Sequence, residues 1–261
     1  MVLTVRLIAL ALAVSAAASA EEPAEVPILV PSPIPIGFLF AWKPTLLSVR
    51  LDSGQGSQFG SDKLQPLRFL GRYTTTLLGE KFLARAELEG GQFQSDRQST
   101  ERIGTDGYDL TLRLLGGTAT RIAPGFIVTA SAGLLTRRQW GRAVGGAPNI
   151  GLLGVTSNAE FEYRIAPLIT VSAYVEGGLT PFPYGAQENL GVLSDASEFR
   201  LRMQFSLDLS PHTALDIGYD FTRWHVSFAQ SSVLGTPDQA LLIEAREHAL
   251  TLGLRWKPEP R

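Results

Sequence analysis

The chain has 261 residues, a formal net charge of −2 and no cysteine. This nearly neutral charge gives no electrostatic footprint for nucleic acid, and the lack of cysteine excludes disulfide bonds and a lipidated N-terminal cysteine. Hydrophobic residues make up 44% of the chain. They are spread evenly rather than gathered in runs, as expected when they occupy every second position of many strands.

The N-terminal region predicts export. An apolar run over residues 7–18 leads into Ala18-Ser19-Ala20, which indicates a signal peptide over residues 1–20. A retained membrane helix is the alternative, but the run is shorter than the roughly 20 residues of a span. Residues 21–44 are rich in proline and predict an extended periplasmic segment. Within it, the aromatic stretch Gly37–Trp42 is expected at the inner membrane interface.

Residues 198–209 carry the clearest strand pattern. Every second residue is apolar and the residues between are polar, which is the period of a pleated strand. The segment is about twice the usual strand length of 5–6 residues. Nine further segments show the same two parities: 45–52, 67–78, 81–94, 107–122, 125–138, 153–165, 167–179, 213–228 and 244–256.

The connections between these segments alternate in length. Short ones at 79–80, 123–124, 167 and 211–212 alternate with longer ones at 53–66, 95–106, 141–152, 182–196 and 229–243. Short periplasmic turns and long outer loops are typical of outer-membrane barrels. The sequence therefore predicts an all-β, up-and-down antiparallel transmembrane barrel of about ten strands over residues 45–256, with eight or twelve as alternatives. Both termini are then periplasmic.

The pattern over residues 45–256 resembles the class of bacterial outer-membrane β-barrels. The last strand resembles the C-terminal assembly signal of that class, with Leu250, Leu252 and Leu254 ending in Trp256. It differs by continuing as a short periplasmic tail, residues 257–261. The resemblance implies a Gram-negative outer-membrane location. It also implies outer-membrane lipid, lipopolysaccharide and the barrel-assembly machinery as partners.

The alternative architecture is a soluble sandwich or ligand-binding barrel with the apolar parity inside. Segments of 12–14 residues exceed what a sandwich needs, and the hairpin layout leaves no Greek-key crossing. The polar parity also carries charge on nearly every strand, which suits a lumen. The predicted lipid-facing residues are Phe199, Leu201, Phe205, Leu207, Leu250, Leu252, Leu254 and Trp256.

The predicted lumen carries charges of both signs in near balance. A barrel of eight strands is just filled by its own side chains, and wide channels need about sixteen. A selective pore would show one dominant sign at its constriction, whereas mixed charges must pair. The sequence predicts a self-plugged lumen, with a narrow solute pore as the alternative. The predicted ionic network comprises Arg85, Glu87, Arg113, Glu160, Glu162, Arg200, Arg202, Asp216 and Asp220.

One constellation suggests chemistry on the lipid-facing side of the last two strands. His225 and Ser227 are two residues apart, and Glu244 begins the following strand. The arrangement resembles the outer-membrane lipid A deacylase family, which implies Ser227 as nucleophile, His225 as base and Glu244 as the group that orients the base. The family continues with Asn-Ala after the serine, where this chain has Phe228-Ala229, and its barrel has fewer strands. The alternative is that His225, beside Trp224, is an interface residue.

Other catalytic arrangements are not favoured. An omptin-like protease would need paired acids and a histidine at the outer rim of the lumen, but His212 is expected in a periplasmic turn and His248 toward lipid. Three scattered histidines without cysteine predict no metal site, and no cofactor is expected. The sequence therefore predicts a non-enzymatic anchor or binding component of a cell-envelope assembly. Its expected protein partners bind through the outer loops or the N-terminal segment.

Overall fold

The computed structural model describes residues 36–53, 56–77, 82–93, 107–141, 149–184, 191–231 and 239–258. The predicted signal peptide and most of the proline-rich segment lie outside these residues, as do the whole of the expected outer loop 95–106 and part of each of the other four. No helix among the described residues could span a membrane.

The described chain forms twelve β-strands. Each strand pairs antiparallel with its neighbours. The strands are β1 (Gly37–Trp42), β2 (Thr45–Ser53), β3 (Gly56–Gln65), β4 (Arg68–Leu77), β5 (Phe82–Phe93), β6 (Gly107–Ala123), β7 (Phe126–Gly141), β8 (Ile150–Ala166), β9 (Ile169–Tyr184), β10 (Val192–Ser210), β11 (Thr213–Ser231) and β12 (Gln239–Trp256).

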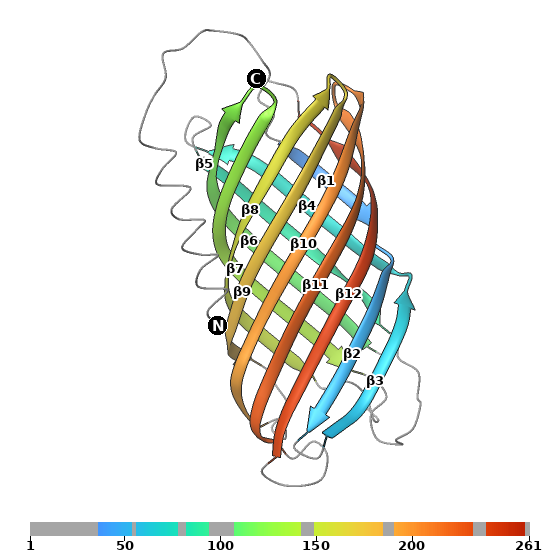
Figure 1. The fold of residues 1–261 in the computed structure, drawn as a ribbon, viewed down its shortest axis with the longest axis vertical. Coiled ribbons are helices and arrows are strands. Elements are labelled where there is room, and N and C mark those ends of the chain that lie inside the picture. The colour runs from blue at the N-terminus through green and yellow to red at the C-terminus, as the bar shows by residue number, and fades with distance from the viewer. Residues whose placement is uncertain are drawn as a thin grey trace.

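Ten of these strands close a barrel. They follow the order β1-β4-β5-β6-β7-β8-β9-β10-β11-β12, and β12 returns to pair with β1. Figure 1 shows the tilted strands of this barrel, with β2 and β3 lying beside β12 at the lower right. The all-β class, the antiparallel up-and-down order and the strand number predicted from the sequence are confirmed. We call the end with the β6–β7, β8–β9 and β10–β11 turns the turn end, and the opposite end the loop end.

The N-terminal part of the described chain contains two strands that the sequence does not predict, β1 and β3. β2 continues along β12 where β1 stops, and β3 pairs with β2 before the chain enters β4. The Lys43 N–H donates to the Arg68 carbonyl at 2.8 Å, so the pairing bridges the junctions at Pro44 and Pro66. The barrel therefore begins at Gly37 rather than Thr45, and the expected loop 53–66 contains strand β3.

These differences have a physical cause. Proline has no N–H and interrupts the hydrogen-bond ladder of a sheet. Pro44 and Pro66 therefore indicated strand ends in the sequence, although the sheet continues past both. In β1, Phe38 and Phe40 face outward while Leu39 and Ala41 are buried. β3 has the sequence GSQFGSDKLQ, which lacks a strand pattern. It forms because β2 offers an unpaired edge of backbone groups.

The outer wall is apolar over most of the barrel and the lumen is ionic. Phe205 and Leu252 are 40% and 48% exposed, whereas Arg200 and Arg202 are 0% and 2% exposed. This orientation is that of a membrane barrel and excludes the soluble alternative with an apolar interior. All eight predicted lipid-facing residues lie on the outward parity.

The parity of burial stays the same along the strands, but the chemical character of the two faces changes toward the loop end. There the inward side chains form an apolar cluster, and the outward ones are polar, such as Arg223, His225 and Arg246. For residues 45–52 the predicted faces were therefore wrong: Leu47 is buried and Arg50 is exposed. The apolar cluster comprises Leu47, Ile150, Leu152, Ala196, Trp224, Val226, Phe228, Leu241, Ile243 and Ala245.

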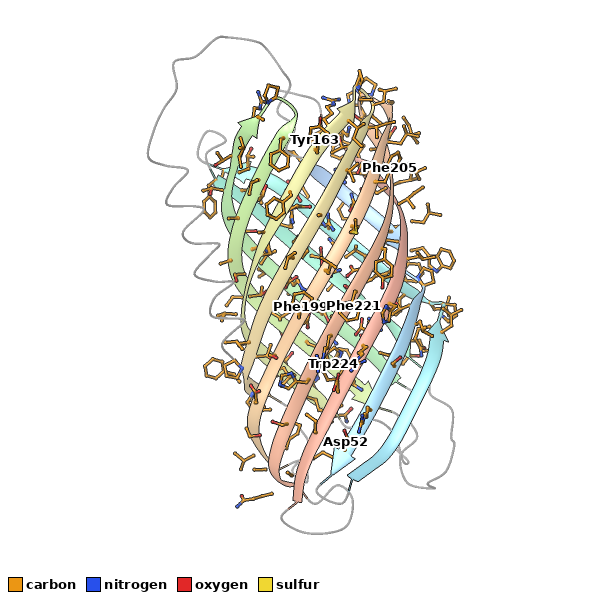
Figure 2. The ribbon with its side chains drawn as sticks, in the orientation of Figure 1. Asp52, Tyr163, Phe199, Phe205, Phe221 and Trp224 are labelled. Atoms are coloured by element: carbon orange, nitrogen blue, oxygen red, sulfur yellow. The ribbon has the colours of Figure 1, made fainter. Side chains whose placement is uncertain are left out.

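Strand length explains this change. β10 and β11 have 19 residues each, or roughly 60 Å of strand at about 3.3 Å per residue. At a tilt of about 45° the strands rise roughly 44 Å, well above the apolar band of about 25 Å. In Figure 2, Phe205 and Tyr163 lie toward the turn end, Phe199 and Phe221 near mid-height, and Trp224 and Asp52 toward the loop end. We call the part beyond Phe199 and Phe221 the loop-end extension.

Candidate functional site

The middle of the lumen holds one connected cluster of paired charges. It contains seven cations and seven carboxylates, so its formal charges cancel among the described residues. The cations are Lys43, Arg68, Arg72, Arg113, Arg137, Arg200 and Arg202, and the carboxylates are Glu87, Glu89, Asp109, Glu176, Glu198, Asp220 and Glu247. We call this set the central ionic cluster.

Arg200 is the hub of this cluster. Its Nε donates to Asp220 Oδ1 at 2.9 Å, its Nη2 donates to Glu89 Oε2 at 3.0 Å, and its Nη1 donates to Glu87. These carboxylates come from β11 and β5. β5 lies on the opposite side of the barrel from β10 in the strand order, so Arg200 connects facing walls of the lumen.

Nine of the fourteen members of the cluster are absent from the predicted ionic network, and Lys43 and Arg137 are two of them. Lys43 is fully buried and pairs with Glu89 and with Asp220 at 3.2 Å, but it lay outside the predicted barrel. Arg137 bonds Glu247 at 3.2 Å and stacks 4.9 Å above the Trp224 ring. Its odd position matches the inward residues of its strand, so the alternation could have identified it.

A second polar group lies nearer the turn end. Arg85 pairs with Glu160 at 2.5 Å, and Arg255 pairs with Asp216 at 2.6 Å. Glu162 is buried without an ion-pair partner among the described residues. All nine predicted lumen residues are buried, and all but Glu162 form ion pairs.

The apolar cluster spans the lumen at the loop end. Ile150 and Leu152 of β8 belong to the same buried cluster as Trp224 of β11 and Ile243 of β12. β8 does not pair with β11 or β12, so this contact crosses the barrel. An ionic layer at mid-height and an apolar layer beyond it thus cross the described lumen in succession.

The predicted His225, Ser227 and Glu244 triad is not assembled. His225 Nδ1 is 3.0 Å from Ser197 Oγ, and its Nε2 is 2.9 Å from Asp195 Oδ2. Ser227 instead bonds Ser194 at 2.7 Å. The cause is strand register: Ser197 lies directly across from His225, whereas Ser227 is about 6.6 Å further along the same strand.

Glu244 does not take its predicted role, whereas His212 lies in a turn and His248 on the outward face. Glu244 accepts from Arg223 and Arg246, each at 3.0 Å, instead of orienting His225. His212 lies in the β10–β11 turn. His248 is on the outer wall, hydrogen-bonded to Tyr219 Oη at 2.6 Å. Among the described residues, no group of three or more acids, histidines or cysteines is arranged to hold a metal ion.

Comparison with known proteins gives the class of the fold. No protein-family model and no curated protein matches the chain. The solved outer-membrane protease OmpT of Escherichia coli is similar in structure, with a TM-score of 0.50 and 12% identity over 89% of this chain and 99% of that one. The outer-membrane protein OprG of Pseudomonas aeruginosa has a TM-score of 0.38 and 12% identity over 86% of this chain and 97% of its own.

The similarity to OmpT concerns the fold alone. Together with the exposed apolar wall and the ionic lumen, it defines the chain as a β-barrel of the bacterial outer-membrane class.

Proposed function

We propose that the protein is a closed, non-enzymatic outer-membrane barrel that serves as an anchor or binding component of a cell-envelope assembly. The central ionic cluster is the observation that supports this function. Arg200 and Arg113 are almost fully buried and each pairs with several carboxylates. Breaking one buried pair costs about 3–5 kcal/mol, so these side chains do not swing aside to admit solute.

The charges also argue against the alternative of a narrow pore. A conducting constriction is usually dominated by one sign of charge, whereas this cluster is balanced. Barrels of about eight strands are filled by side chains, and aqueous channels appear near sixteen. A ten-stranded barrel whose lumen is crossed by two layers of side chains therefore supports a closed lumen better than a solute channel.

The loop-end extension supports the binding role. It rises roughly 20 Å beyond an apolar band of about 25 Å and is built like a soluble protein, with Trp224 and Phe228 inside and charged residues outside. Such an extension holds the outer loops away from the bilayer on a rigid support. Envelope proteins are the proposed partners there or at the periplasmic N-terminal segment, with both termini periplasmic.

Planar-bilayer recording tests the closed lumen. Purified wild type should give no discrete conductance steps, and neither should Arg50→Ala, whose side chain lies on the outer wall. The variant Arg113→Ala/Arg200→Ala/Trp224→Ala, which thins both the ionic and the apolar layer, should conduct. Discrete conductance steps in wild type would contradict the closed lumen and support the narrow pore instead. A pull-down from detergent-solubilised envelopes tests the binding role, and recovery of the barrel with no envelope protein would contradict it.

A further inference from the structure

Two arginines face each other on the outer wall of the loop-end extension. Arg223 of β11 and Arg246 of β12 are direct cross-strand partners, and their side chains are 52% and 56% exposed. Like charges in this position repel each other. A single carboxylate oxygen, Glu244 Oε1, accepts from Arg223 Nε at 3.0 Å and from Arg246 Nη2 at 3.0 Å. With two positive charges and one negative charge, Arg223, Arg246 and Glu244 have a formal net charge of +1.

The bonds to Glu244 leave guanidinium donors available. Arg223 reaches the carboxylate through Nε, so its two Nη groups are not used in this contact. Arg246 uses Nε and Nη2, which leaves Nη1. Glu244 therefore holds both side chains in place and still leaves Arg223 Nη1 and Nη2 and Arg246 Nη1 free of this contact. Fixed guanidinium forks of this kind suit the oxygens of a phosphate.

The arginines lie at the height of lipid headgroups. Directly toward the turn end, the next outward residues are Phe221 and His248, with ring centroids 5.0 Å apart. Tyr219 hydrogen-bonds His248, and Phe199 is the cross-strand partner of Arg223. Aromatic groups with one polar end mark the membrane interface. The arginine pair is one outward position beyond that aromatic belt.

The surface beyond the pair is rich in hydroxyl and carboxylate groups. His225 with Asp195, and Ser194 with Ser227, lie on β10 and β11 further toward the loop end. These donors and acceptors match the hydroxyls of a sugar, whereas a glycerophosphate headgroup offers few partners for them.

From this placement we propose that Arg223 and Arg246 bind the phosphate group of a membrane glycolipid, with its sugar against the Asp195–His225 side chains and its acyl chains along the apolar wall. The proposal does not depend on whether the lumen conducts. It assigns the loop end to the leaflet that contains a phosphorylated glycolipid.

Lipid binding to the purified full-length barrel in detergent tests this site. The probes are bisphosphorylated lipid A, the same lipid after removal of its phosphates, and phosphatidylglycerol. Wild type should prefer bisphosphorylated lipid A. Because a hydrogen bond to a charged group contributes about 1.5–3 kcal/mol, Arg223→Gln and Arg246→Gln should each weaken that binding by about tenfold or more.

Arg121→Gln is the matched control, since Arg121 is exposed near the turn end of β6 and should bind lipid A like wild type. Heat-dependent gel mobility verifies that each variant is folded. Equal binding of lipid A with and without its phosphates would overturn the proposal, as would unchanged binding by folded Arg223→Gln/Arg246→Gln. Equal binding of phosphatidylglycerol would overturn the assignment to a glycolipid.

Discussion

Arg200 on β10 and Glu87 on β5 form an ion pair between strands on opposite sides of a ten-stranded barrel. The contact joins facing walls through the centre of the lumen, where Arg200 is fully buried. A barrel wall alone would not require such a pair, because each strand is already bonded to its neighbours. The pair therefore connects two facing walls of the barrel across the lumen.

Replacing Arg200, the hub of the central ionic cluster, should lower the free energy of unfolding. Arg200→Ala leaves Glu87, Glu89 and Asp220 with one cation fewer, and a broken buried pair costs about 3–5 kcal/mol. Arg50→Ala removes an exposed pair with Asp52 and should cost at most about 1 kcal/mol. Denaturant unfolding in detergent compares the two, and equal midpoints would contradict a paired central cluster.

The apolar cluster at the loop end should behave like a soluble protein core. Trp224→Ala creates a cavity there and should lower the free energy of unfolding by about 3–5 kcal/mol. Trp256→Ala is the control, because Trp256 is exposed on the outer wall at the turn end and its loss leaves no internal cavity. Thermal unfolding followed by circular dichroism measures both variants. A larger loss for Trp256→Ala would show that the cluster is not a core.

The closure between β1 and β12 can be tested by cross-linking. Phe40 and Leu254 are cross-strand partners, and the chain has no cysteine of its own. Phe40→Cys/Leu254→Cys should form a disulfide on oxidation, because paired strand positions place Cβ atoms about 4.5–5.5 Å apart. Phe40→Cys/Leu250→Cys, two outward positions further along, should not. If neither pair cross-links in the folded protein, β1 does not close the barrel.

The hydrogen bonds of His225 give a prediction about activity. Ser227 is engaged by Ser194 and Glu244 by two arginines, so Ser227→Ala should leave the acylation of lipid A unchanged in cells. Ser197→Ala, which removes the hydroxyl next to His225, should do the same for a non-enzymatic barrel. Mass spectrometry of lipid A compares each variant with wild type. An altered acyl pattern in either one would establish a hydrolase.

The sequence predicts the barrel and the polar character of its lumen because alternation is a local pattern. Around Arg200 and Leu252, the alternation of neighbouring residues indicates which side chains share a face. Ten segments of this kind gave the predicted strand number. The predicted faces near Leu47 were wrong. Alternation shows that the apolar residues share a face, but it does not show whether that face meets lipid or a dry interior. The assignment depends on how far a strand extends beyond the bilayer, and that length emerges only when the strands are paired.

The partners of His225 could not be predicted for a related reason. They depend on the register between β10 and β11, which shifts at an irregularity between Leu193 and Asp195. The barrel start was missed because Pro44 separates a six-residue strand from its continuation. In both cases the missing information is a pairing between distant segments, and local composition carries no signal for it.

Quenching by brominated lipids tests the central claim, that the outer wall faces lipid only below the loop-end extension. Single cysteines at Leu252, Thr251 and Arg246, each carrying the same fluorophore, sample the apolar wall, the lumen and the extension of one strand, β12. The structure predicts strong quenching at Leu252 and little at Thr251 or Arg246. Strong quenching at Thr251 with none at Leu252 would mean that the polar face meets the lipid, and would contradict the account.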